Sequence, residues 1–150
     1  RDYYASRGLG DVYKRQVITE AEEIEKLCSG SSLYIVCTGD AFRTLPQGRY
    51  RSRRIGEFSA PGIAGECLYD IFDSDPYALI KLKEQFSAEF AKAVSLFESG
   101  DFTAARTRFM DIVKYAPDDG AARNYLYLAE HNINSGRRRL TYRIYDGSEA

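Results

Sequence analysis

Hydrophobic and polar positions follow two different periods along this chain, and the change comes near Pro76. Residues 49–76 have the period of two, with aromatic and β-branched enrichment, that is typical of strands. The second of these strands has two distinct faces, one carrying Cys67, Tyr69 and Ile71 and the other Leu68, Asp70 and Phe72. In the first strand, Arg51, Arg53 and Ile55 share a face and alternate with Tyr50, Ser52 and Arg54. The pattern predicts a hairpin, with a long loop over the turn-forming residues 59–65.

Upstream of the hairpin, the pattern predicts one helix, one strand and one short helix. Val17 to Cys28 has helical spacing, an acidic outer face and Thr19 as a candidate cap. Leu33 to Cys37 is a continuous apolar run, which is typical of a strand buried on both faces. Thr38 begins a brief helix that ends by Leu45.

Downstream of Pro76 the period is helical. The predicted inward stripe of the first helix is Leu79, Leu82, Phe86, Phe90, Ala93, Val94 and Phe97, with Lys83 on the polar side. Asp101 is the predicted cap of a second helix, which stops before Pro117. Asp118 or Asp119 is the predicted cap of a third helix, which ends at Gly136. Residues 137–150 have no clear period and are predicted to be a frayed, flexible tail.

The helical part has the spacing of a tetratricopeptide repeat. The matching positions are Gly100, Phe102, Ala105, Phe109 and Pro117. One repeat and the first helix of another are present, and such a unit cannot bury its apolar face alone. We expect it to dock on the α/β part, on a second copy or on a partner. We interpret its phenylalanines as helix packing and not as a cofactor site.

Composition excludes some classes of function. The chain has 150 residues, 44% hydrophobic and 29% charged, with a net charge of −1, so no overall field favours nucleic acid. Three cysteines without CxxC spacing and a single histidine, His131, make a metal site improbable and fit buried thiols in a reducing cytosol. No apolar run approaches the length of a membrane span. We expect a cytoplasmic protein without nucleic acid as a partner.

The first sixteen residues differ from the rest. They have no apolar period, and Asp11 to Gln16, DVYKRQ, is the translation of a transposase end sequence used in sequencing libraries. We interpret residues 1–16 as translated adapter, to be set aside from the fold. A genuine basic arm is the alternative. On the first interpretation, the native protein continues upstream of this fragment.

Residues 17–75 resemble the C-terminal third of a class III nucleotidyl cyclase catalytic domain. The likeness lies in the order EIEKLCSGSSLYIVCTGDAFRTL, YRSRRIGEF and CLYDIFDSDP, with the last closing strand at 68–73. It implies a parent enzyme, a lyase, that converts ATP or GTP to the cyclic nucleotide and pyrophosphate in intracellular signal transduction. It also implies a homodimer or a parent-domain partner, with Mg²⁺ or Mn²⁺ held by the parent. A membrane anchor could lie in the missing N-terminal part.

The departures from that family bear on catalysis. The family's ribose-binding asparagine and transition-state arginine match Thr19 and Glu23 here. Thr19 remains a candidate for substrate binding, but a carboxylate at Glu23 opposes phosphoryl transfer. The hairpin loop lacks the family's lysine, and its metal-binding aspartates lie upstream of this chain. We therefore expect no catalytic and no metal-binding residue in this chain, and no cofactor of its own.

The predicted fold class is α+β: the end of a ferredoxin-like cyclase layer in residues 17–75, then tetratricopeptide-like helices in 76–136. The predicted function is a catalytically silent scaffold and tail of the cyclase, and the alternative is a protein-interaction module. Whether the chain is an enzyme stays open.

Charged residues of the hairpin and the third helix allow functional and structural interpretations. Arg49, Arg51, Arg53 and Arg54 could bind nucleic acid, but we favour a solvated edge strand whose charges deter pairing. His131 lies near a helix C-terminus, where positive charge is favourable.

Overall fold

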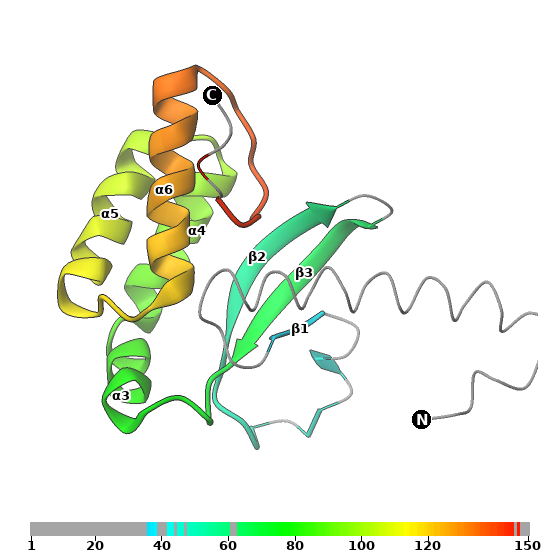
Figure 1. Cartoon of the computed structure of the whole chain (residues 1–150). Coiled ribbons are helices and arrows are strands. Elements are labelled where there is room, and N and C mark those ends of the chain that lie inside the picture. The colour runs from blue at the N-terminus through cyan, green and yellow to red at the C-terminus, as the bar shows by residue number, and fades with distance from the viewer. Residues whose placement is uncertain are drawn as a thin grey trace, which may run out of the picture.

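The structure, a computed structural model, describes residues 36–38, 42–43, 45–46, 48–60, 63–145 and 147. Three strands form one antiparallel sheet in the order β1-β3-β2, and four helices follow in the chain (Figure 1). The strands are β1 (Val36–Thr38), β2 (Ser52–Ala60) and β3 (Ile63–Ile71). The helices are α3 (Tyr77–Gln85), α4 (Ser87–Glu98), α5 (Phe102–Tyr115) and α6 (Gly120–Ser135). The α+β class is confirmed, and the ferredoxin-like layer stays a prediction.

The hairpin is tighter than predicted. Ala60 pairs with Ile63, so the strands extend into the expected loop and leave only residues 61–62 between them, which lie outside the described part. The prediction of a long loop over residues 59–65 is therefore wrong. Strand pairing thus reaches further toward the turn than the turn-forming composition of residues 59–65 indicates.

An irregularity in β2 explains why its buried positions do not alternate strictly along the strand. The pairing with β3 shifts between Arg54 and Gly56, and both Ile55 and Phe58 are buried although they are three positions apart, which would place them on opposite faces of a regular strand. A β-bulge has this effect, because it adds one residue to one strand. Gly56 has φ 147°, and a Cβ atom there would overlap the hydroxyl of Tyr125. Glycine thus lets α6 approach the strand closely.

The ends of α5 and α6 follow the predicted caps. Asp101 accepts a hydrogen bond from Ala104 N at 3.2 Å, and Asp119, the second of the two candidates, accepts from Ala122 N at 3.2 Å. Gly136 ends α6 in the left-handed conformation, with φ 73°. Local sequence therefore determined where these helices begin and end.

The predicted first helix is in fact two helices. Phe86, with φ −96° and ψ 17°, separates α3 from α4, although its amide still donates to Leu82 O at 2.9 Å. The stripe of apolar residues continues across the break, so the period alone does not reveal it. With the break, α3 lies below the bundle that α4, α5 and α6 form (Figure 1).

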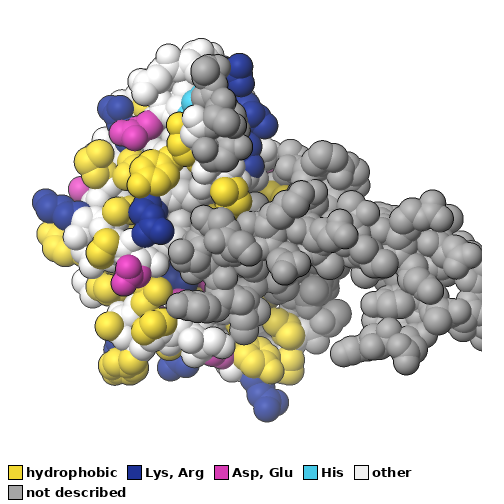
Figure 2. All heavy atoms as spheres, viewed as in Figure 1, with side chains coloured by type: hydrophobic (Ala, Val, Ile, Leu, Met, Phe, Trp, Pro, Cys, Tyr) yellow, Lys and Arg dark blue, Asp and Glu magenta, His cyan; other side chains and the backbone are white. Residues whose placement is uncertain are grey.

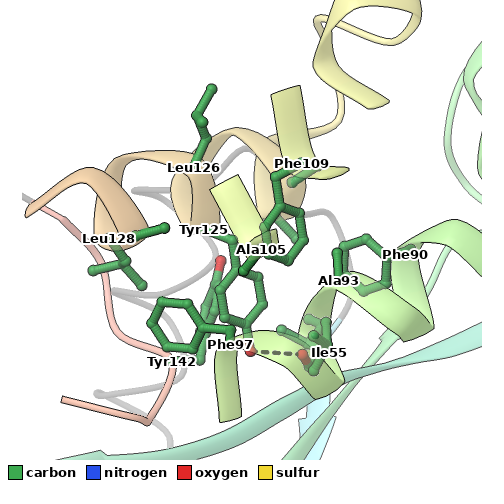
Figure 3. Close-up of a cluster of buried hydrophobic side chains, with 14 of the residues drawn as sticks. Ile55, Phe90, Ala93, Phe97, Ala105, Phe109, Tyr125, Leu126, Leu128 and Tyr142 are labelled. Carbon is green, nitrogen blue, oxygen red and sulfur yellow. Dashed lines mark hydrogen bonds between the residues drawn. The ribbon is translucent and has the colours of Figure 1, made fainter. Parts of the chain in front are cut away.

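One hydrophobic core joins the hairpin to the helices. It contains Ile55, Phe58 and Leu68 from the sheet together with inward residues of α4, α5 and α6. Tyr125 lies at its centre, 4.8 Å from the ring of Phe109, and its hydroxyl donates to Ile55 O at 2.9 Å (Figure 3). The helical unit thus docks on the α/β part, which was one of the three expected possibilities, and its aromatic stripe is helix packing as predicted.

The segment after Gly136 is not frayed as far as Tyr145. Tyr142 is fully buried and its amide donates to Glu57 O at 2.7 Å. The segment returns along α6 to the edge of β2 (Figure 1). The prediction of a flexible tail from residue 137 is therefore wrong for residues 139–145. This segment is held by single contacts with residues far away in the sequence. Such contacts produce no hydrophobic period, so the sequence did not reveal them.

Candidate functional site

The predicted substrate-binding residue, Thr19, lies outside the described residues, as do Glu23 and residues 1–16, which we interpreted as adapter. The arginines of the hairpin are described, and they divide into two groups. Arg51 and Arg54 are exposed, as a solvated edge strand requires, and β2 is an edge strand of the sheet. Arg53 lies between them and is buried, with a side chain only 8% exposed. For Arg53 the prediction of a solvated arginine is wrong.

The two exposed arginines bind acidic side chains of other elements. Arg51 Nε lies 3.0 Å from a carboxylate oxygen of Glu84 in α3. Arg54 donates through both terminal nitrogens to Glu98 at the end of α4, at 3.2 and 3.0 Å. Such exposed pairs contribute little to stability, typically under about 1 kcal/mol.

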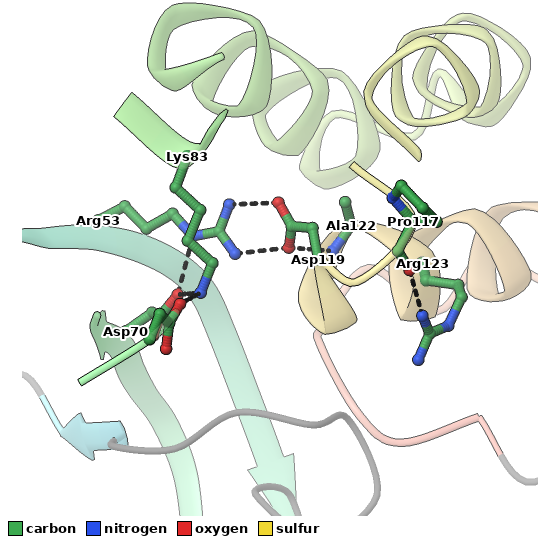
Figure 4. A network of polar contacts seen from close by, with 8 residues as sticks. Arg53, Asp70, Lys83, Pro117, Asp119, Ala122 and Arg123 are labelled. Carbon is green, nitrogen blue, oxygen red and sulfur yellow. Dashed lines mark hydrogen bonds and ion pairs between the residues drawn. The ribbon is translucent and has the colours of Figure 1, made fainter. Parts of the chain in front are cut away.

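Arg53 connects the two strands to the start of α6. Its Nε donates to Asp70 Oδ2 in β3 at 3.0 Å, and its terminal nitrogens make two parallel bonds to the carboxylate of Asp119, at 2.9 and 2.6 Å (Figure 4). The guanidinium also lies 4.1 Å from the centre of the Phe90 ring in α4. Bidentate pairing and stacking on a ring are the two geometries that suit arginine and not lysine.

Lys83 of α3 binds the same oxygen of Asp70 that Arg53 binds. Its Nζ lies 2.8 Å from Asp70 Oδ2 and 2.6 Å from Asp75 Oδ2, and all three side chains are at most 2% exposed. The helical period placed Lys83 on the polar side of its helix, and this is also wrong. We call the five residues Arg53, Asp70, Asp75, Lys83 and Asp119 the ionic cluster.

The charges of the ionic cluster do not cancel when all five groups are ionised, because three carboxylates face two cations. Burial raises the pKa of Asp75, and the nearby Lys83 only partly offsets this. Burial also pushes the pKa of Asp119 upward, but the charge and hydrogen bonds of Arg53 outweigh it and hold that pKa below its usual value. Burial thus favours the protonated form of Asp75, whereas Arg53 favours the ionised form of Asp119.

Partner carboxylates stabilise the positive charge of Arg53. Burial lowers the pKa of this guanidinium, and Asp119 and Asp70 more than reverse the effect, so its pKa is above the ordinary value. A buried charge is tolerated only with such pairing. The chemistry open to the cluster is therefore to hold elements in place. A substrate cannot reach side chains that are exposed by 8% or less.

Two surface pockets are open to small molecules or peptides. One, of about 390 Å³, lies between α3 and the loop before α6 and is lined by Leu79, Leu82 and Pro117 among others. The second, of about 350 Å³, includes Phe42, whose ring stacks on Tyr69 with centroids 4.0 Å apart. Sequence analysis predicted neither pocket. The first combines residues about 40 positions apart in the sequence, and the second forms within the single stretch 42–52.

Figure 2 shows apolar and charged side chains interspersed over the described surface on one face of the molecule. His131, in the last turns of α6 as predicted, is 8% exposed, and its ring centre lies 5.7 Å from that of Tyr145. Within the described residues, no group of three or more His, Cys, Asp or Glu side chains could hold a metal ion.

No helix among the residues that the structure describes is long and apolar enough to span a bilayer. Comparison of the chain with known protein families, curated proteins and solved structures finds no match.

Proposed function

We propose that this chain is a catalytically silent scaffold that fixes a helical tail to the closing hairpin of a class III nucleotidyl cyclase or a degenerate relative. The parent reaction is the conversion of ATP or GTP to the cyclic nucleotide and pyrophosphate. The observation that carries the scaffold role is the ionic cluster, which ties β2 and β3 to α3 and α6.

Buried charges make the joint between hairpin and helices rigid. If α6 moved away from β2, Arg53 and Asp119 would separate inside a region closed to water. Removing one partner of a buried pair commonly costs about 3–5 kcal/mol, so such a movement is strongly resisted. The shared core around Tyr125 adds a second attachment. The tail therefore has one orientation relative to the hairpin.

The cyclase part of the proposal is supported by the sequence resemblance over residues 17–75. The silence of the chain is supported by Glu23, which stands where the family has a transition-state arginine, and by the absence of the family's lysine from the hairpin loop.

Two measurements test this proposal. The purified chain, mixed with ATP or GTP and Mn²⁺, should form no cyclic nucleotide above a protein-free control, and turnover by the chain would contradict its silence. In a protein extended upstream to include the metal-binding strands, Arg53→Met should lower cyclic nucleotide formation at a temperature where circular dichroism shows it folded. Arg54→Met is the matched control. Equal activity of the two variants would exclude the scaffold role.

A protein-interaction module is the second candidate function. The repeat-like spacing and the exposed aromatic side chains of Tyr77, 73% exposed, and Tyr115, 62% exposed, favour it. Because the helices share a core with the hairpin, the whole chain is needed for the test. Selection from a displayed peptide library should yield ligands whose binding is weakened by Tyr115→Ser and not by Met110→Ser. Ligands insensitive to both substitutions would argue against this surface.

A further inference from the structure

Residues 139–145 lie beside the edge of β2 and bind its main chain at one point, through Tyr142. Among the strands that the structure describes, β2 is at the edge of the sheet, so one side of its main chain faces no other described strand. Tyr142 N donates to Glu57 O at 2.7 Å, and Tyr142 forms a parallel bridge with Phe58. We call residues 139–145 the strap and the space it occupies between β2 and α6 the strap groove.

Helix α6 binds the main chain of the strap from the other side. Asn124 Nδ2 donates to Arg143 O at 2.6 Å, and Asn124 Oδ1 accepts from Tyr145 N at 2.9 Å. Asn132 Nδ2 donates to Arg139 O at 3.0 Å. Both asparagines are buried, with 6% and 2% of their surface exposed. Buried amides are costly unless they are paired, and here their partners are main-chain atoms that every extended peptide has.

One side chain of the strap is held in a closed environment. Tyr142 is fully buried, and its ring centre lies 4.9 Å from that of Tyr125 in an edge-to-face arrangement (Figure 3). The neighbouring Leu140 is 37% exposed, and Arg143 and Ile144 are half-buried. Ile144 and Tyr145 are partly buried and also pack against the core. The groove therefore recognises an extended main chain, one fully buried aromatic side chain and two further apolar positions.

We propose that the strap groove is a docking site for an extended peptide segment of a partner protein that carries an aromatic residue, and that the strap is its resident occupant. Edge pairing with main-chain bonds for affinity and a side-chain pocket for specificity is a recurring mode of peptide recognition. The exposed Arg137 and Arg138 after Gly136 form the tether, so the strap can leave without breaking α6. This inference goes beyond the scaffold role and does not depend on it.

The tether determines when a partner can bind. A short flexible link gives the strap an effective concentration on the order of millimolar, so a free peptide competes poorly with it. Once the tether is cut, the strap is a separate peptide, and it dissociates when the protein is diluted. We therefore expect the cut chain to bind a free peptide at least about 100-fold more tightly than the uncut chain.

The test uses the full chain with a specific protease site inserted between Gly136 and Arg137, folded first and then cut. The probe is a fluorescent peptide with the sequence of residues 137–145, RRRLTYRIY. Replacing its tyrosine at position 142 by alanine should weaken binding by about 100-fold, because a buried aromatic ring is lost. The matched control, alanine at position 140, should bind within about threefold of the original, since Leu140 is partly exposed.

A second set of peptides distinguishes a docking site for other proteins from a contact that serves only the folding of this chain. Peptides that keep an aromatic residue at position 142 and the apolar residues at positions 144 and 145, and have scrambled residues elsewhere, should bind the cut chain within about tenfold of the native sequence. Binding of the native sequence alone would overturn the proposal, as would unfolding of the cut chain when the strap leaves. A dimer of the uncut chain that Tyr142→Ala abolishes would assign the groove to a second copy and overturn its assignment to a different protein.

Discussion

Strand β2 meets the helices at two places with different chemistry. Near its start, Arg53 joins the ionic cluster, where charges from β3, α3 and α6 pair at 2.6–3.0 Å. Farther along, Ile55 and Phe58 enter the aromatic core around Tyr125, and the strap covers the edge of the strand. At the ionic end, stability depends on the direction of the hydrogen bonds and on the balance of charges. At the aromatic end, it depends mainly on the volume of the buried side chains.

The difference between these two regions predicts how each responds to change. Apolar cores tolerate substitutions that keep their volume, whereas a buried ion that loses its partner cannot be solvated. The ionic cluster should therefore fix the position of the helices, and the aromatic end should allow the strap to leave. Four substitutions test this contrast, in order of decreasing effect.

Arg53→Met should have the largest effect on stability. It keeps much of the apolar volume but leaves Asp119 and Asp70 buried with Lys83 as the remaining cation of the cluster, so the free energy of unfolding should fall by about 3–5 kcal/mol. The control, Arg54→Met, removes an arginine that is 43% exposed and should cost under about 1 kcal/mol. Urea unfolding measures both, and equal losses would show that the cluster is not the stronger joint.

Tyr142→Ala should come next. Loss of a buried aromatic ring costs about 3 kcal/mol at the lower end of the usual range, because the strap can detach and relieve the cavity. Hydrogen exchange of the strap amides should rise while that of β3 stays unchanged. Leu140→Ala is the control. Faster exchange throughout the sheet would mean that the strap is an inseparable part of the core.

Tyr125→Phe isolates one hydrogen bond inside the aromatic region. The ring and its packing remain, but Ile55 O loses its donor at 2.9 Å, and the free energy of unfolding should drop by about 1–2 kcal/mol. Tyr127→Phe, at a position 44% exposed, should change it by less than about 0.5 kcal/mol. If Tyr125→Phe left the free energy of unfolding unchanged, packing alone would hold the bulge of β2 against α6.

Asp75→Asn should have the smallest effect, and one that depends on pH. Since burial raises the folded-state pKa of Asp75, its contribution to stability is complete below the unfolded-state pKa and is lost as pH rises through the folded-state value. The free energy of unfolding of Asp75→Asn relative to the unchanged chain should therefore increase with pH over that interval, by at most about 1.4 kcal/mol per pH unit. A decrease with pH would mean that Lys83 outweighs burial, so that the folded-state pKa of Asp75 lies below its unfolded-state value.

The opposite pH dependence belongs to Asp119. Because Arg53 holds its folded-state pKa below the usual value, its contribution is present above the unfolded-state pKa and is lost as pH falls through the folded-state value. Protonation of Asp119 at low pH should thus weaken the contact between β2 and α6.

Much of the fold could be predicted from the sequence, and little of the candidate site. The strands, α5, α6 and their caps follow from signals within a few residues, such as the alternation in β3 or Asp101 before α5. The cluster could not be predicted, because Arg53 and Asp119 are 66 residues apart and each has an ordinary local explanation, as an edge arginine and a helix cap. A lone lysine inside an apolar stripe would have been the best available signal, but Lys83 lies on the polar side of the helical period.

The sequence by itself determined where this chain is helical or extended, because helix caps, proline and hydrophobic period act over one or two turns of chain. Only the tertiary structure decided which polar residues are buried, where the helix after Pro76 breaks and where residues 139–145 lie. Burial of an arginine, a lysine or an asparagine is favourable only when its partners are present, and those partners come from other elements of the fold.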